Sequence, residues 1–289
     1  MKKTYLLFAC FLSTTLFANE PDASNSFQFT KPQVEGYHKN SATQLEAIFA
    51  KLGSEFFVNA ERILDIGCGD GKITAVLAKQ MPQSSIVGCD VSHSMIAFAK
   101  KQYGSSEYPN LNFIEKNACK LGFKEEFDRV VSFNCLHWIN DQKAALNAIF
   151  TCLKPGGKAC LIASTRTVED DLQFCCSKLV TSEKWNFYFQ DYPKVHSFHT
   201  EEEYQQILTN SGFSIDNIQQ NIREVVFENR QSFEEWVSPV LTPMHHLHEK
   251  NRKSFLNDLF AELKLRERVD ESGKVHLHVS QIELLATRP

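Results

Sequence analysis

The stretch RILDIGCGDGKITA, residues 62–75, decides the fold because it joins an apolar strand to a helix through three glycines. A strand this apolar is typical of the buried centre of a parallel sheet. Gly67, Gly69 and Gly71 carry no Cβ, so the backbone can turn tightly and approach a ligand closely. The helix that follows, predicted over residues 72–81, points its unpaired amide groups at that ligand. The stretch therefore predicts a nucleotide-type cofactor site in an α/β fold.

The spacing of the glycines separates two classes of cofactor. A dinucleotide fingerprint needs a third glycine three positions after the second one, and Lys72 occupies that position here. A strand that runs through Asp65 into G-x-G-x-G resembles instead the first motif of the class I S-adenosylmethionine (SAM) methyltransferases. The resemblance implies that Asp65, Gly67, Cys68 and Gly69 lie at the cofactor, with Asp65 beneath its methionine end.

A second predicted strand, residues 85–91, supplies the expected ribose ligand. It reaches Asp90, which follows Gly71 by 19 positions (90 − 71). An acidic side chain at this distance can accept both hydrogen bonds of a ribose diol. In the family pattern, Val91 covers one face of the adenine and Met95 packs nearby.

Two further strand ends complete the expected cofactor residues. The strand predicted over residues 112–117 leads into Asn117 and Ala118, where the family usually has Asp-Ala at the adenine. An amide oxygen can still accept the adenine hydrogen bond, although without the strength that a charge gives. We also assign Asn134, in the fourth predicted strand over residues 127–135, to the cofactor.

The fourth strand and the residues after it indicate a particular group within this family. VVSFNCLHWIND, followed by ALNAIFTCLKPGG, resembles the trans-aconitate and juvenile hormone acid methyltransferases, which methylate carboxylates of small molecules. YHKNSATQLEAIF, residues 37–49, resembles the segment that folds over the cofactor in this group. By that match Gln44 and Trp138 lie beside the substrate carboxyl group. In LKPGG, residues 153–157, a helix is expected to end and a turn to follow.

These motifs leave three functional readings open. In the first, the chain transfers a methyl group from SAM to a carboxylate, which is ionised at neutral pH and needs no base. In the second, His137 acts as a base for an amine or hydroxyl acceptor; otherwise it is a wall of the pocket. In the third, the chain keeps the SAM fold but only binds a ligand. The first is the predicted function.

The resemblance implies a Rossmann-like sheet of seven mostly parallel strands, with helices on both faces and a helical, aromatic-rich lid. We expect a bulge near Gln219 and a last strand that runs antiparallel between the fifth and sixth. The later strands are predicted over residues 158–164, 213–227 and 274–287, and the later helices over residues 169–182, 201–211, 231–239 and 244–269.

Four segments follow from this reading of the 289 residues. They are a signal-peptide-like segment, a linker, a SAM-binding core, and a lid with the last strands, over residues 1–18, 19–34, 35–164 and 165–289. The first segment has two lysines, an apolar run and Leu-Phe-Ala, which suggests export. SAM is made in the cytoplasm, and the cysteines resemble buried apolar residues rather than a disulfide framework. The localisation therefore stays open.

Composition restricts the partners. The net charge is −4, and lysines and arginines are scattered, so the chain lacks the basic stripe of a nucleic-acid-binding face. We expect a monomer that binds a small-molecule acceptor, an apolar or cyclic carboxylic acid. No metal site is predicted, because no cysteine or carboxylate follows His245, His246 and His248 at a zinc-ligand spacing.

Overall fold

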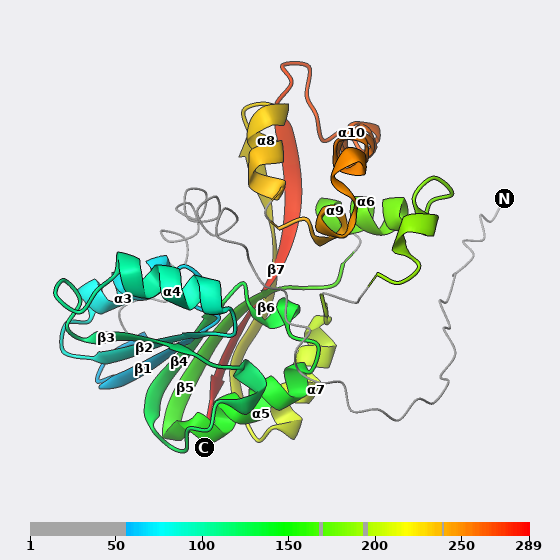
Figure 1. Ribbon diagram of the computed structural model, residues 1–289. Helices are drawn as coiled ribbons and strands as arrows, with labels where there is room; N and C mark the ends of the chain where they lie inside the picture. Colours follow the sequence, from blue (N-terminus) through cyan, green and yellow to red (C-terminus); the bar gives the residue numbers. More distant parts are fainter. Residues whose placement is uncertain (1–55, 168–169, 193–195, 239) are drawn as a thin grey trace.

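A seven-stranded sheet with the order β3-β2-β1-β4-β5-β7-β6 forms the centre of the protein (Figure 1). The structure, a computed structural model, describes residues 56–289 except 168–169, 193–195 and 239. β1 to β5 run parallel, and β7 lies antiparallel between β5 and β6, as expected from the sequence. The strands are β1 (Arg62–Ile66), β2 (Ser85–Asp90), β3 (Leu111–Glu115), β4 (Phe127–Phe133), β5 (Leu153–Ser164), β6 (Ser214–Phe227) and β7 (Val275–Thr287).

Helices cover both faces of this sheet. The α-helices are α3 (Lys72–Gln80), α4 (His93–Gln102), α5 (Gln142–Cys152), α6 (Asp171–Val180), α7 (Glu201–Asn210), α8 (Arg230–Val237), α9 (Thr242–His246) and α10 (Glu249–Leu265). Three 3₁₀ turns are η1 (Ala118–Lys120), η2 (Leu136–Trp138) and η3 (Asn186–Phe189). One apolar cluster joins the sheet to α3 and α4, and another joins it to α5 and α7. Consecutive residues of β1 and β4 are buried, as expected for central strands that are covered on both faces.

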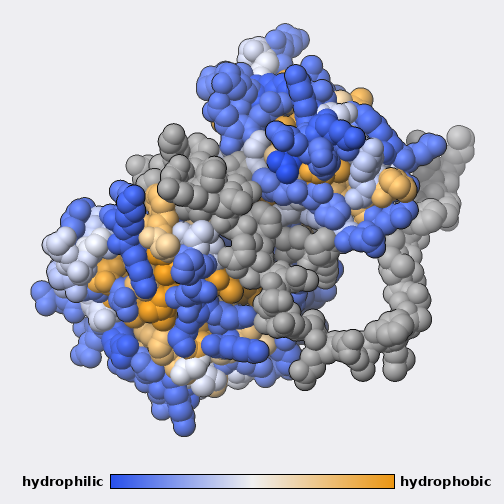
Figure 2. All heavy atoms as spheres, in the orientation of Figure 1, coloured by the Kyte–Doolittle hydropathy of each residue, from blue (hydrophilic) through white to orange (hydrophobic). Residues whose placement is uncertain are grey.

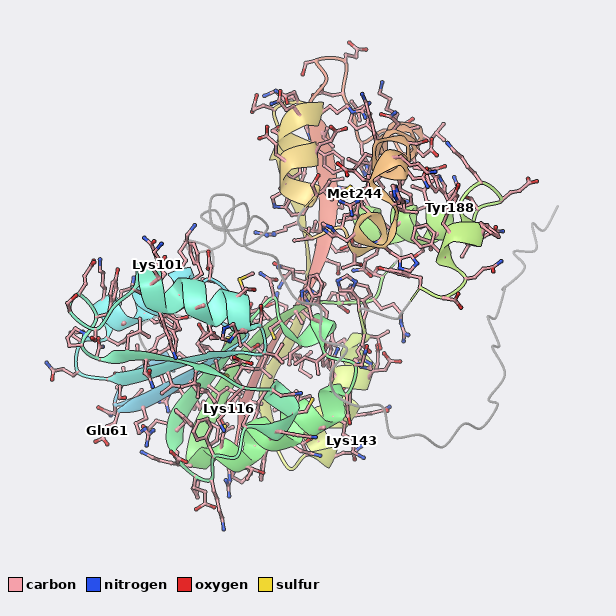
Figure 3. The ribbon with its side chains drawn as sticks, viewed as in Figure 1. Glu61, Lys101, Lys116, Lys143, Tyr188 and Met244 are labelled. Atoms are coloured by element: carbon pink, nitrogen blue, oxygen red, sulfur yellow. The ribbon has the colours of Figure 1, made fainter. Side chains whose placement is uncertain are left out.

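A third apolar cluster forms an upper lobe, which we define as α6, η3, α8, α9, α10 and the adjoining ends of β6 and β7. β7 pairs with β5 only from Gln281 onward, so residues 275–280 pair with β6, apart from one bridge between Val269 and Val275, and extend beyond the rest of the sheet (Figure 1). Met244 lies inside this lobe and Tyr188 on its outer side (Figure 3). The visible surface of the lobe is mainly hydrophilic (Figure 2). The predicted lid segment therefore has its own core.

Two carboxylates at the start of α6 connect this lobe to the sheet. Asp170 accepts a hydrogen bond from the backbone N–H of Ser280 at 3.0 Å. Asp171 is fully buried and accepts from the N–H of His278 at 2.7 Å. The side chains take the place of the strand that β7 lacks beyond the end of β5. Asp171 also accepts from Nε of Arg266 at 2.8 Å and of Arg268 at 2.7 Å.

Three sequence predictions are wrong in detail. LKPGG does end a helix, but instead of forming a turn between elements it lies within β5. The register of β4 and β5 jumps between Phe127–Leu153 and Arg129–Lys158, so this segment is a bulge. The irregularity in β6 lies between residues 215 and 217 rather than near Gln219.

The third error concerns the helix predicted over residues 244–269. It is two helices, α9 and α10, because Leu247 and His248 have extended backbone angles between them. Other helix and strand ends differ from the predictions by a few residues, as helix ends commonly do. Within the described residues, no helix has both the length and the apolar character needed to cross a membrane.

The buried Asp171 cluster leads to a stability prediction. We expect Asp171→Ala to lower the free energy of unfolding by about 3 kcal/mol, because it leaves two arginines and a strand N–H without their acceptor. Urea unfolding measures this. The matched control is Glu107→Ala, which removes an exposed carboxylate 3.0 Å from Lys79 and should leave stability unchanged. Equal stability of the two variants would contradict a structural role for Asp171.

Candidate active site

The glycine turn between β1 and α3 is held against two neighbouring strands. Gly67, Gly69 and Gly71 have φ angles of 72°, 53° and 80°, which glycine adopts without strain. The N–H groups of Gly67 and Cys68 both donate to the carbonyl of Cys89, at 2.7 and 3.0 Å. A Cβ on Gly67 would lie 2.3 Å from Sγ of Cys135. Only glycine fits this position.

Asp90, at the end of β2, fixes the turn through its carboxylate. One oxygen accepts from the N–H of Gly69 at 3.0 Å and the other from the N–H of Ser92 at 2.8 Å. Each oxygen keeps a further lone pair that can accept from a hydroxyl. Burial raises the pKa of Asp90. Val91 follows, half-buried, and Met95 is buried in α4.

Asp65 lies beneath the turn, in β1. Its carboxylate is buried and accepts a hydrogen bond from Oγ1 of Thr74, in α3, at 2.7 Å. Burial raises the pKa of Asp65 to about 7. A cationic group placed near this carboxylate would favour its ionised form.

The side chains of Asn117 and Asn134 both accept hydrogen bonds from other residues of the protein. Asn117 caps η1, since its Oδ1 accepts from the N–H of Cys119 at 2.8 Å, and Ala118 begins that turn. Asn134 has a φ of 55°, and its Oδ1 accepts from Nε2 of Gln281 in β7 at 2.9 Å. The sequence did not single out Gln281, whose side chain reaches Asn134 only because β7 inserts next to β5.

His137 and Trp138 form η2, directly after β4. The His137 ring is only 7% exposed, and its Nδ1 accepts a hydrogen bond from the backbone N–H of Ser164 at 3.1 Å. Burial, and then the neighbouring imidazole of His196, lower the pKa of His137 to about 3. The ring is therefore neutral at physiological pH, and its one proton is on Nε2. In this tautomer His137 is a hydrogen-bond donor, not a base.

A third part of this site, the segment of residues 196–199, belongs to the predicted aromatic-rich lid, but the sequence did not single out His196. The ring of His196 lies 4.3 Å from Trp138 and 5.9 Å from His137, and the ring of Phe198 lies 6.0 Å from His137. The N–H of Ser197 donates to the carbonyl of His137 at 2.8 Å. No motif marks this segment, because only the fold brings it to η2.

Gln44, and the whole of residues 37–49, lie outside the described residues. Their place beside the cofactor and acceptor stays a prediction. The ends of the signal-peptide-like segment at residue 18 and of the linker at residue 34 also stay predictions.

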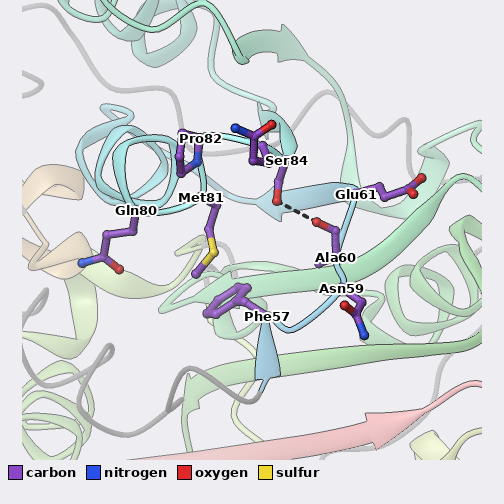
Figure 4. A pocket seen from close by; sticks show the side chains of 9 residues that line it. Phe57, Asn59, Ala60, Glu61, Gln80, Met81, Pro82 and Ser84 are labelled. Carbon is purple, nitrogen blue, oxygen red and sulfur yellow. Dashed lines mark hydrogen bonds between the residues drawn. The ribbon is translucent and has the colours of Figure 1, made fainter.

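A hollow of about 440 Å³ lies elsewhere, at the amino ends of β1 and β2 (Figure 4). It is lined by Phe57, Met81 and neighbouring residues, and Oγ of Ser84 donates to the carbonyl of Ala60 at its edge, at 2.6 Å. The glycine turn follows the opposite, carboxyl end of β1. The described residues contain no group of three or more metal-ligating side chains.

The residues at the carboxyl ends of β1, β2 and β4 fit SAM. The turn packs closely against the neighbouring strands only because Gly67 and Gly71 lack a Cβ. A Cβ on Gly71 would lie 2.6 Å from Phe113. Asp90 is a buried carboxylate with acceptor capacity for a ribose diol. Asp65 is a second buried carboxylate, suited to an ammonium group.

Comparisons with known proteins bear on the family of this chain. Residues 63–157 match a family described as a methyltransferase domain. The chain is 28% identical to juvenile hormone acid O-methyltransferase of Drosophila melanogaster, over 68% of this chain and 69% of that protein. It is 23% identical to malonyl-[acyl-carrier protein] O-methyltransferase of a Paenibacillus strain, over 74% and 80%.

The fold also matches a solved structure. A Haemonchus contortus phosphoethanolamine N-methyltransferase in complex with SAM aligns with a TM-score of 0.60, at 20% identity, over 90% of this chain and 57% of that one. At this identity the match concerns the fold.

The close contact at Gly67 predicts an effect on cofactor binding. We expect Gly67→Ala to weaken SAM binding at least about ten-fold, because the new methyl group collides with Cys135 and a left-handed alanine costs about 1–2 kcal/mol, so the turn must shift away from the backbone geometry that the cofactor needs. Isothermal titration calorimetry measures this. The control is Gly104→Ala, since a Cβ there has no atom within 4 Å. Identical affinities for the two variants would contradict the assignment of the turn.

The raised pKa of Asp65 predicts a pH effect on the ligand-free protein. Its ordinary value is 3.8 and its folded value about 7, so between these the folded state keeps a proton that the unfolded state releases. The free energy of unfolding should therefore fall as the pH rises from about 4 to about 7. Asp65→Asn cannot titrate, so its curve should fall less steeply. Urea unfolding at pH 5 and pH 8 gives the change in the free energy of unfolding with pH for both proteins. An equal change in the wild type and in Asp65→Asn would contradict the raised pKa of Asp65.

Proposed function

We propose that this chain, which is a class I SAM-dependent methyltransferase, methylates a carboxylate oxygen of a small organic acid. The observation that carries the proposal is the hydrogen bond from Ser164 to Nδ1 of His137. It leaves η2 with a neutral N–H donor where a base-dependent reaction would need an acceptor of protons. A carboxylate requires donors and no base, because it is ionised at neutral pH.

The names of the relatives support this proposal. One relative is a juvenile hormone acid O-methyltransferase, and others are malonyl-[acyl-carrier protein] O-methyltransferases. Each name describes methylation of an oxygen, and the first names an acid as the acceptor. We infer that this chain acts on the same functional group. The names do not determine the rest of the acceptor molecule, beyond its carboxylate.

The reaction places few chemical demands on the protein. SAM supplies a methyl group on a positively charged sulfur, which is a good leaving group. The residues around η2 would position the acceptor oxygen for in-line displacement at that methyl group and exclude water. The aromatic rings of His137, Trp138, His196 and Phe198 suit the exclusion of water, since neighbouring ring centroids lie 4.3 to 6.0 Å apart.

The residues that we propose to bind SAM lie at or near the carboxyl ends of the parallel strands. Asp90 accepts from the ribose diol, and Asp65 lies toward the methionine end, beneath Gly67, Cys68 and Gly69. In the same proposal Val91, Met95, Asn117, Ala118 and Asn134 surround the adenine and the rest of the cofactor, and Gln44 joins Trp138 at the acceptor.

A second candidate, methylation of an amine or hydroxyl with His137 as base, has less support. For His137 to take a proton on Nδ1, its hydrogen bond with Ser164 must break, and Nε2 already carries a proton in the observed tautomer. Burial also opposes the imidazolium form. The third reading, a protein that binds SAM without catalysis, is separated from the first by the assay below.

Methyl transfer from labelled SAM to a panel of small carboxylic acids, amines and alcohols tests the proposal. We expect product from acids, released by mild base as esters are, and a rate nearly constant from pH 6 to pH 8, because the acceptor stays ionised. Base-stable product from amines alone would contradict the proposal. Tight SAM binding with no transfer to any compound would favour the non-catalytic reading.

A further inference from the structure

We infer that His196 and His137 together bind the carboxylate of the acceptor, through two neutral imidazole N–H groups, and thereby select an apolar carboxylic acid. This inference rests on the proposed carboxyl methylation and deepens it. It assigns a role to His196, which no motif in the sequence marks.

The first step is the orientation of His137. Its Nδ1 is used by the N–H of Ser164, so the remaining polar atom of the ring is Nε2–H. The ring is 93% buried (100 − 7), and among the described residues nothing accepts a hydrogen bond from Nε2. Nε2 is not among the buried polar atoms that lack a partner, so its N–H keeps some exposure and can donate to a molecule bound beside it. An oxygen of the acceptor would supply the missing partner.

The second step is the position of His196. Its ring stacks on His137, with centroids 5.9 Å apart and an angle of 28° between the planes, and on Phe198, at 5.3 Å and 17°. The ring of Trp138 also lies beside it, with centroids 4.3 Å apart and an angle of 58° between the planes. Burial lowers the pKa of His196 to about 4, so this ring is neutral as well. A neutral imidazole always carries one N–H, and no described residue accepts from it.

The third step is the fixed geometry of the segment that carries His196. Ser197 donates its N–H to the carbonyl of His137, and its own carbonyl accepts from Nε2 of Gln142 at 2.5 Å. The carbonyl of His199 accepts from Oγ1 of Thr165 at 2.7 Å and from the N–H of Arg166 at 3.0 Å. Four hydrogen bonds therefore hold residues 197–199 to η2, α5 and the end of β5.

The chemistry of neutral donors suits this reaction. A carboxylate that is hydrogen-bonded by neutral N–H groups keeps more of its electron density than one paired with an arginine, so it remains a better nucleophile. The guanidinium of Arg166, whose backbone N–H donates to the carbonyl of His199, is paired with Glu203 at 2.5 Å. The flanking rings of Trp138 and Phe198 offer an apolar surface rather than further charges. The site thus favours an acid with an apolar body.

Calorimetry with octanoate and cyclohexanecarboxylate tests the inference, using full-length protein saturated with S-adenosylhomocysteine. We expect at least one of the two acids to bind the wild-type protein. His196→Phe keeps the ring contacts but removes the N–H, so it should weaken that binding about ten-fold or more. His196→Asn restores a donor and should recover part of the affinity. Phe198→Leu is the matched control, which removes a stacking ring without removing a donor.

Several outcomes would overturn the inference. Binding of neither acid at millimolar concentration would exclude an apolar carboxylic acid. Equal affinity of His196→Phe and the wild type, or equal losses in His196→Phe and Phe198→Leu, would exclude His196 as a donor. SAM affinity should be unchanged in every variant, which separates a lost donor from a damaged fold. If the acid panel yields esters but His196→Phe binds like the wild type, this inference fails while the proposed function stands.

Discussion

The close approach of β1, β2 and β4 at Gly67 is the constraint on which the rest of the site depends. Two N–H groups of the turn donate to one carbonyl of β2, and the Cα of Gly67 faces Cys135 with no room for a side chain. The contact fixes where β1 ends and where α3 begins. It therefore also places the Asp90 carboxylate at the turn and η2 beside it.

Around this contact the protein satisfies its buried polar groups with side chains from distant elements. Asp170 and Asp171 complete the hydrogen bonding of β7 where β5 ends. Ser164, the last residue of β5, sets the tautomer of His137. Both arrangements follow from one fact, that β5 stops while β7 continues. In the proposed function, these strand ends also determine which hydrogen-bond donors the acceptor would contact.

Much of the fold was predictable, because it depends on local patterns and on strand order. The apolar strands, the glycine turn and the antiparallel last strand are all confirmed. The errors have physical causes. In LKPGG, proline and glycine stop a helix but do not reveal that the neighbouring strand keeps pairing through a bulge. Between α9 and α10, no proline or glycine marks the break, so an apolar pattern suggested one helix.

The sequence by itself determined the class of cofactor, since the spacing of Gly67, Gly69, Gly71 and Asp90 is a property of neighbouring strand ends. Only the tertiary structure decided the chemistry of the acceptor end. From the sequence His137 is more readily a wall of the pocket than a base, and the fold makes it a donor because the N–H of Ser164 occupies its Nδ1. His196 joins it through packing alone. Contacts between residues so far apart along the chain leave no local pattern, because burial and strand pairing bring them together.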